Sequence, residues 1–462
     1  MSNDIGTNLL IDLIEKRYPR EDAWYGVEWD VTVASSVCIR IGRADMHIAL
    51  PIQSQIKSAV VRDDQTIAYY LDPLDATKRE NGAAAILDGT DGQVLAIFPT
   101  HYRKFESDGV KRRVKISPYP LKDYVKVQRN ATGRYLGSVA SNKLLSVSGV
   151  MPTTGKTRAQ FRSYAAARGA GWSQVYYSAY ADIFWLYLIE YADFNSQLKL
   201  GDGATNASST DWAAYNSYYP VLNNGVGNGL GNRSGSIPFT ITDWYRGITT
   251  GAGSNKCIAT GRFSSWNASY VGMTIKNIAT NATALIVSKD TNDQISIDAD
   301  IFTASGQGFV ILNSTFTSQA AVYRGIEHIF GQIWSFIDGI NINYIDDNNR
   351  LAYICSSPLF FADNTATNYI LAGNISANEG YVKSLIPGHI LPESVGGSSS
   401  TWMSDYHYKP ALNTAGWRVA LWFGSLSVGA YAGLLFANCL CSSGDSRASI
   451  GSRLNLTFTQ NA

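Results

Sequence analysis

The sequence predicts an α+β protein, and three observations support that class. Residues 24–105 carry β-rich runs, partly alternating in polarity, between polar turns, which is typical of strands. Residues 254–313 form a second train of short β-rich runs with Asn and Asp turns. Between these regions, residues 157–169 and 178–196 have helical patterns. We therefore expect an all-β N-terminal domain, a small inserted β-barrel and a C-terminal domain that mixes helices and strands.

The two expected helices differ in their surroundings. Thr157 is placed to cap the start of the first helix, and Gly169 is placed to end it. The second helix, 178–196, is strongly apolar, and Glu190 falls on or beside its buried stripe. Glu190 therefore either pairs with a buried polar partner or lies on an exposed flank.

A third aromatic stretch, residues 323–342, is interrupted by glycine at regular intervals. Glycine is unfavourable inside helices, so one long helix is not expected there. Short helical turns and an edge loop fit the pattern better. The glycines are Gly325, Gly331 and Gly339.

Composition narrows the classes of function. The chain has 462 residues with 38 Lys plus Arg and 37 Asp plus Glu, a net charge of +1. This balance argues against a protein that binds nucleic acid through a basic surface. Tyr, Ser, Gly and Asn are abundant, and these residues are common in adaptable binding surfaces. The cysteines are too scattered for a disulfide framework or a zinc site: Cys38, Cys257, Cys355, Cys439 and Cys441.

Motifs for chemistry are weak throughout the chain. The stretch GVMPTTGKT at 149–157 has five residues between its glycines, whereas a phosphate-binding loop needs four. Asp405 and His407 would share one face of a strand, where a structural hydrogen bond is favoured over a catalytic dyad. The histidines show no metal-ligand spacing. We therefore expect no enzymatic activity, no cofactor and no metal.

The run VALWFGSLSVGAYAGLLFANCLCSS at 419–443 contains no charge. It is long enough to span a bilayer, but its glycines, serines and asparagine are unfavourable for insertion. The first part of the run has the pattern of a buried strand. The last part shows neither the two-residue repeat of a strand nor the 3.6-residue repeat of a helix. We expect strand and loop, and no membrane insertion. The first 19 residues lack the basic start and apolar core of a secretory signal.

The wider stretch GWRVALWFGSLSVGAYAGLLFANCLCSSGDSRASIGSRL at 416–454 resembles the variable region of proteins diversified by diversity-generating retroelements. In that family a fixed frame carries positions that mutate at adenines, typically in Asn codons. Such codons cannot become Lys, Gln, Glu, Met or Trp, and none of these occurs from Phe423 to Ser449. Burial could exclude the same residues. The positions that fit the fixed frame are Gly429, Ala432, Gly433, Ile450, Gly451, Arg453 and Leu454.

The resemblance extends upstream. The stretches TRAQFRSYAAARG, YRGIEHIFGQIWSFIDGINI and EGYVKSLIPGHILPESVGG are similar to C-type-lectin-fold proteins of gut Bacteroides phages. No EPN or WND motif of a calcium-dependent lectin is present. The resemblance implies a C-type-lectin-like domain with a β insertion. The implied division is 1–120 for an N-terminal β domain that serves assembly or virion attachment, 121–249 with 319–462 for the lectin-like domain, 250–318 for the insertion, and 418–451 for the variable region.

In function, the resemblance implies a receptor-binding protein at a phage tail or fibre tip, assembled in the host cytoplasm and carried on the virion. Its expected partners are a host cell-surface receptor, protein or glycan, and other tail proteins, with no nucleic acid. A homotrimer is expected because the family is often trimeric. The alternatives are a bacterial surface-displayed adhesin of the same fold and a structural tail protein without a receptor.

The same resemblance suggests which side chains meet the receptor. The variable region is expected to fold back between two closing strands, so that its exposed side chains gather on one surface. The alternative is that the apolar side chains among the candidates belong to the core. The candidates are Leu426, Ser427, Val428, Tyr431, Asn438, Cys439, Leu440, Cys441, Asp445 and Arg447.

Overall fold

The computed structural model describes residues 20–206, 222–264, 270–410 and 415–459. It is mostly β, with 39% strand and 12% helix. The expected α+β class with a C-type-lectin-like domain is therefore wrong. Short strands, paired over long sequence separations, form most of the regular structure on the C-terminal side of the chain, and the helices are few.

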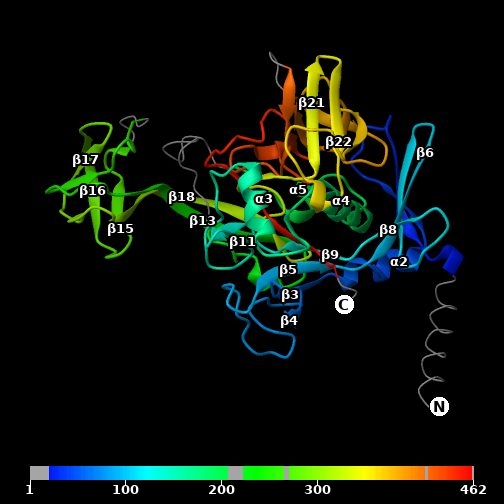
Figure 1. The fold of residues 1–462 in the computed structure, drawn as a ribbon, viewed down its shortest axis with the longest axis horizontal. Helices are drawn as coiled ribbons and strands as arrows, with labels where there is room; N and C mark the ends of the chain where they lie inside the picture. The colour runs from blue at the N-terminus through cyan, green and yellow to red at the C-terminus, as the bar shows by residue number, and fades with distance from the viewer. Residues whose placement is uncertain (1–19, 207–221, 265–269, 411–414, 460–462) are drawn as a thin grey trace.

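A central sheet joins strands from both ends of the chain (Figure 1). Its order is β12-β31-β9-β5-β3-β4, and every neighbouring pair is antiparallel. The last strand, β31, thus lies between two strands of earlier segments. The bounds are β3 Lys57–Val61, β4 Ile67–Tyr70, β5 Gln93–Phe98, β9 Asn130–Gly133, β12 Trp172–Gln174 and β31 Leu454–Thr457.

A second sheet is built from N-terminal strands in the order β2-β1-β7-β6-β8. In its register Trp29 lies opposite Arg112, and Ser107 lies opposite Arg112 from the other side. These three side chains therefore share one face of the sheet. The bounds are β1 Tyr25–Asp30, β2 Ile39–Gly42, β6 His101–Asp108, β7 Lys111–Ser117 and β8 Val125–Val127.

A third sheet extends to one end of the molecule (Figure 1). Two long paired strands, β13 and β18, lead out to it from the rest of the structure. It has its own apolar core, which includes Phe263, Ile275 and Phe309. The bounds are β13 Gly235–Ile248, β14 Lys256–Ile258, β15 Thr274–Asn277, β16 Thr283–Lys289, β17 Gln294–Ile297 and β18 Gly308–Tyr323, with β19 Ile326–Glu327 pairing to β18.

Both expected helices are present. α3, Arg158–Ala166, begins at Thr157, whose side chain accepts a hydrogen bond from the backbone N–H of Gln160 in a capping box. α4, Tyr177–Tyr191, is buried along most of its length and ends earlier than expected, at Ala192. Of the two alternatives for Glu190, the structure shows pairing with a largely buried partner: its carboxylate lies 2.6 Å from the Arg324 guanidinium.

The C-terminal part forms two further sheets, of order β25-β24-β26-β29-β28-β20-β30 and β23-β22-β21-β27. The expectation of helical turns at 323–342 is wrong, because β19, β20 and β21 lie there. β19 pairs with the preceding β18, whereas β20 and β21 also have partners far along the chain, β28, β30 and β27. The bounds are β20 Trp334–Phe336, β21 Ile340–Asp346, β22 Asn349–Ile354, β23 Ile370–Asn374, β24 Gly380–Leu385, β25 Pro392–Val395, β26 Tyr406–Tyr408, β27 Gly416–Arg418, β28 Leu421–Trp422, β29 Ala437–Asn438 and β30 Ile450–Gly451.

Smaller elements complete the description. They are α2 Ala44–Ala49, α5 Ser196–Leu200, β10 Ser138–Ala140, β11 Lys143–Leu145, and the 3-10 turns Arg20–Asp22, Gln53–Gln55, Asn228–Leu230, Pro358–Phe360 and Gly429–Tyr431. Within the described ranges, none of the helices combines the length and hydropathy that crossing a membrane requires. The segment that precedes residue 20 lies outside the described residues.

Candidate functional site: a cavity in the variable region

Residues 418–451, which the resemblance leads us to expect to vary and which we call the variable region, are held in place by a buried frame. Asp405, which directly precedes β26, accepts a hydrogen bond of 2.7 Å from the backbone N–H of Leu435. A Cβ at Gly433 would lie 2.0 Å from Oδ1 of the same carboxylate, so only glycine fits there. Burial raises the pKa of Asp405 well above its ordinary value, which favours the neutral acid.

Arg453 fixes the far end of this region. Its guanidinium is buried and donates to four backbone carbonyls: Gly133 at 2.9 Å, Arg134 at 3.1 Å, Glu327 at 2.7 Å and His328 at 2.9 Å. All four carbonyls belong to segments that precede the region in sequence, two at 133–134 and two at 327–328. The side chain thus ties the end of the variable region to the central sheet and to the segment after β18.

Burial, close packing or backbone conformation also accounts for the residue type at the remaining frame positions. Ala432, Ile450 and Leu454 are buried, and a Cβ at Gly451 would lie 2.6 Å from the Ile333 side chain. Gly429 has a positive φ of 56°, which favours glycine. We call Gly433, Gly451, Arg453 and these buried residues the frame.

Between the frame positions, the chain encloses a cavity of about 280 Å³, here called the variable-region cavity. Its walls come from β20, β26, β28, the turn at 427–431 and the loop that follows β29. The lining residues are Trp334, Tyr408, Leu421, Ser427, Val428, Tyr431, Asn438, Leu440, Cys441, Arg447, Ser449 and Ile450.

Seven of the ten residues that the sequence suggested for receptor contact line this cavity: Ser427, Val428, Tyr431, Asn438, Leu440, Cys441 and Arg447. Leu426 and Cys439 do not, because they are 0% and 1% exposed and belong to the core. The expectation that they are surface side chains is wrong. Asp445 is half-buried beside the cavity, with its carboxylate 3.6 Å from the Arg447 guanidinium.

A cluster of tyrosines adjoins the cavity. The rings of Tyr431 and Tyr406 stack at 4.3 Å between centroids, with an interplanar angle of 24°. Tyr381 and Tyr408 meet the Tyr431 ring edge-on at 5.5 and 6.4 Å. Tyr431 is 37% exposed, so part of this aromatic surface is available to a ligand.

Sequence reasoning missed three of these tyrosines, Tyr381, Tyr406 and Tyr408. The stretch DYHYKP drew attention to Asp405 and His407, whereas the tyrosines that flank His407 reach the cavity or its aromatic cluster. Their alternation along β26 was available in the sequence. No hydrogen bond joins Asp405 to His407 among the described residues, so the expected structural bond is absent there.

The polar groups of the cavity are suited to recognition. The Arg447 side chain is 51% exposed and presents a cation at the mouth. Burial raises the pKa of the Cys441 thiol to about 12, so this thiol is neutral at physiological pH. Ser427 and Asn438 add neutral donors and acceptors. Aromatic rings, one cation and neutral polar groups around a small hollow are typical of binding sites.

Among the described residues, no group of three His, Cys, Asp or Glu side chains is arranged to hold a metal ion. The chain was also compared with known proteins: no protein-family model matches it, and no curated protein matches it. The geometry of the site and the sequence pattern are thus the grounds for inferring a function.

Proposed function

We propose that this protein is a receptor-binding protein of a phage tail or fibre tip, and that the variable-region cavity contacts a receptor on the host cell surface. The supporting observation is a partial separation within one segment: seven of the ten residues that suit diversification line a cavity, while most residues that suit a fixed frame are buried. Such a separation lets the contact surface change without changing the fold.

The proposal includes the origin of the variation. Retroelement-directed mutation of the codons for Ser427, Tyr431, Asn438 and Arg447 would alter the cavity wall while leaving the frame intact. Binding would be non-catalytic and weak at each site, and several copies on one virion, as in a homotrimer, would multiply it.

Sequencing this gene across a phage population tests the origin of the variation. We expect substitutions to concentrate at the cavity-lining positions of 418–451 and to spare Gly433, Gly451 and Arg453. An even distribution of substitutions along the chain would overturn the retroelement proposal.

A binding assay tests the receptor role. Tyr431→Ala and Arg447→Ala should each lower binding of the purified chain to host cells by at least about 10-fold, because aromatic and Arg side chains dominate binding hot spots. Arg62→Ala is the matched control, since Arg62 is exposed on another part of the molecule. If both cavity variants bind like the control, the structural tail protein becomes the better proposal.

A further inference from the structure

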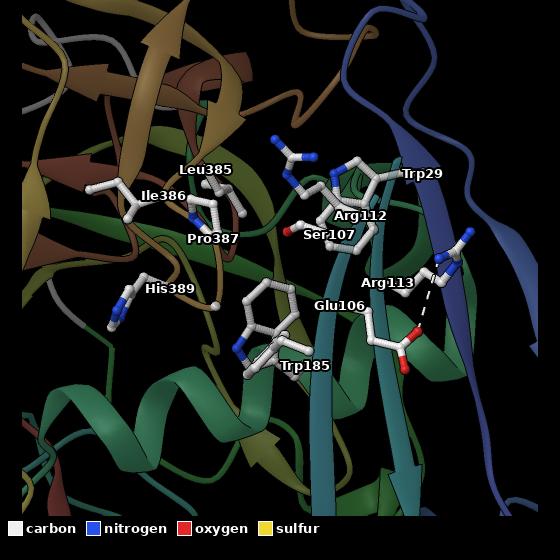
Figure 2. Close-up of a pocket in the computed structure, with 12 residues that line it drawn as sticks. Trp29, Glu106, Ser107, Arg112, Arg113, Trp185, Leu385, Ile386, Pro387 and His389 are labelled. Atoms are coloured by element: carbon white, nitrogen blue, oxygen red, sulfur yellow. Dashed lines mark ion pairs between the residues drawn. The ribbon is translucent and has the colours of Figure 1, made fainter. Parts of the chain in front are cut away.

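A second pocket lies apart from the variable region, between the N-terminal sheet and α4 (Figure 2). We call it the tryptophan pocket. It has a volume of about 180 Å³, and it shares no lining residue with the variable-region cavity. One wall is the sheet face that carries Trp29, Ser107 and Arg112, a second is Trp185 of α4, and the loop 386–389 closes the third side.

The apolar part of the pocket is aromatic. The ring systems of Trp29 and Trp185 are nearly parallel, at 20°, with centroids 6.2 Å apart. Phe105 meets Trp185 edge-on at 5.0 Å. A volume of about 180 Å³ accommodates a single six-membered ring, since an engineered cavity of about 150 Å³ holds benzene.

One buried donor in this wall is unpaired. Trp185 is 2% exposed, yet its Nε1–H has no hydrogen-bond acceptor among the described residues. In Figure 2 the indole nitrogen faces the side of the pocket where His389 lies. A buried N–H without an acceptor is unfavourable, so a ligand that supplies an oxygen here would be stabilised.

The mouth of the pocket carries further polar groups. Arg112 donates from Nη1 to the carbonyls of Gly109 and Lys111, and its Nη2 and Nε have no acceptor in the described part of the chain. Ser107 is exposed next to it. Arg113 is already paired with Glu28 at 2.6 Å, and Glu106 with Lys115 at 2.7 Å. Arg112 is therefore the cation best placed to meet an incoming anion.

These features together select a ligand class. A flat aromatic wall suits the C–H face of a sugar ring, and the indole N–H and Ser107 suit its ring and hydroxyl oxygens. An aliphatic or aromatic protein side chain would fill the volume but leave the Trp185 donor unpaired. We propose that the tryptophan pocket binds one sugar ring that bears a carboxylate, with the carboxylate on Arg112. The protein would then have a glycan-binding site of constant sequence in addition to the variable-region cavity.

Titration with small sugars tests this site in the full-length chain. The probes are methyl β-glucuronide, methyl β-galacturonide and N-acetylneuraminic acid, with methyl β-glucoside as the neutral comparison. Saturation-transfer NMR should detect at least one acid, and the glucoside should bind at least about 10-fold more weakly. No transfer to any of the three acids at about 50 mM, or equal binding of the glucoside, would overturn the proposal.

Variants locate the binding within the molecule. Arg112→Gln should remove most of the preference for the acid, and Trp185→Phe, which keeps a ring but removes the N–H, should weaken both kinds of sugar about 5-fold or more. Lys111→Gln is the matched control, since Lys111 is the neighbouring residue on β7 and pairs with Glu28 on the other face of the sheet. If Arg112→Gln, which lies at the rim and not in the core, binds the acid like Lys111→Gln, the assignment of this pocket is wrong.

Discussion

The frame and the wall of the variable-region cavity alternate along the same stretch of chain, yet their surroundings are opposite. Gly433 and Arg453 are enclosed by polar groups at fixed distances, whereas Tyr431 and Arg447 face open volume. Even the two cysteine positions differ, since both side chains are buried but only Cys441 lines the cavity. A segment can thus tolerate change at some positions because neighbouring positions tolerate none.

The largest contrast is expected between two arginines. Arg453→Met should lower the free energy of unfolding by about 3–5 kcal/mol, because four buried carbonyls lose their donor. Arg447→Met, the matched change at the cavity mouth, should stay within about 0.5 kcal/mol. Urea unfolding measures both. Similar losses in the two variants would contradict the distinction between frame and wall.

A pair of glycines gives the next largest effect. Gly433→Ala should cost about 3 kcal/mol or prevent folding, because its Cβ would collide with the buried Asp405 carboxylate. Gly444→Ala is the control, since the nearest atom to its Cβ would be 3.9 Å away. Thermal melting of both proteins tests this. A Gly433→Ala protein as stable as the control would show that Asp405 can move aside.

Two leucines test where the core ends. Leu426→Ala should cost about 2–3 kcal/mol, because the side chain is fully buried in the apolar cluster that also contains Ala204 and Ile333. Leu440→Ala should cost less than about 1 kcal/mol, because this half-buried side chain lines the cavity. Denaturant unfolding again provides the measurement. If Leu440→Ala lowers the free energy of unfolding more than Leu426→Ala does, Leu440 belongs to the core and not to the cavity wall.

Acid tests the contribution of a buried histidine, His407, without altering the cavity wall. Burial lowers the pKa of His407 in β26 to about 3, so the folded state holds it neutral. Its contribution to stability is present above the unfolded pKa of about 6.5 and is lost as pH falls towards 3, at about 1.4 kcal/mol per pH unit. Asp405 and Glu327, whose pKa values burial raises, act in the opposite sense over part of this range.

The test therefore compares the pH dependence of the free energy of unfolding in the native chain and in a His407 variant. His407→Gln should lose about 2 kcal/mol less stability than the native chain between pH 6.5 and pH 5. Unfolding curves at several pH values give both slopes. Parallel slopes would mean that His407 titrates equally in the folded and unfolded states.

Local patterns in the sequence predicted local structure well. Thr157 caps α3 as expected, the apolar run at 178–196 contains α4, and the uncharged run at 419–443 contains short strands, a turn and loop. These features depend on neighbours within a few residues. Seven of the residues that the resemblance suggested for receptor contact line the cavity, Tyr431, Asn438 and Arg447 among them, and their contact with a receptor stays a prediction.

Pairing over long distances in sequence could not be predicted in the same way. The stretch 323–342 forms strands because partners such as Trp422 and Arg418 lie opposite it, and no local pattern reveals them. Leu426 is core because it belongs to an apolar cluster with residues far away in sequence, such as Leu136 and Ile333, and an alternation of small and apolar residues does not reveal that grouping. The tryptophan pocket combines residues about 360 positions apart, Trp29 and His389, and so no motif marks it.

The position of β31 has a consequence for how the protein is made. This strand pairs with β12 on one side and β9 on the other, so the central sheet lacks its inner member until residues 454–457 have been synthesised. A stop codon or frameshift anywhere in 418–451 deletes that member and leaves two strand edges unpaired, which exposes the product to aggregation and proteolysis. The fold thereby discriminates against incomplete products: a chain that stops or changes frame within 418–451 cannot complete the central sheet.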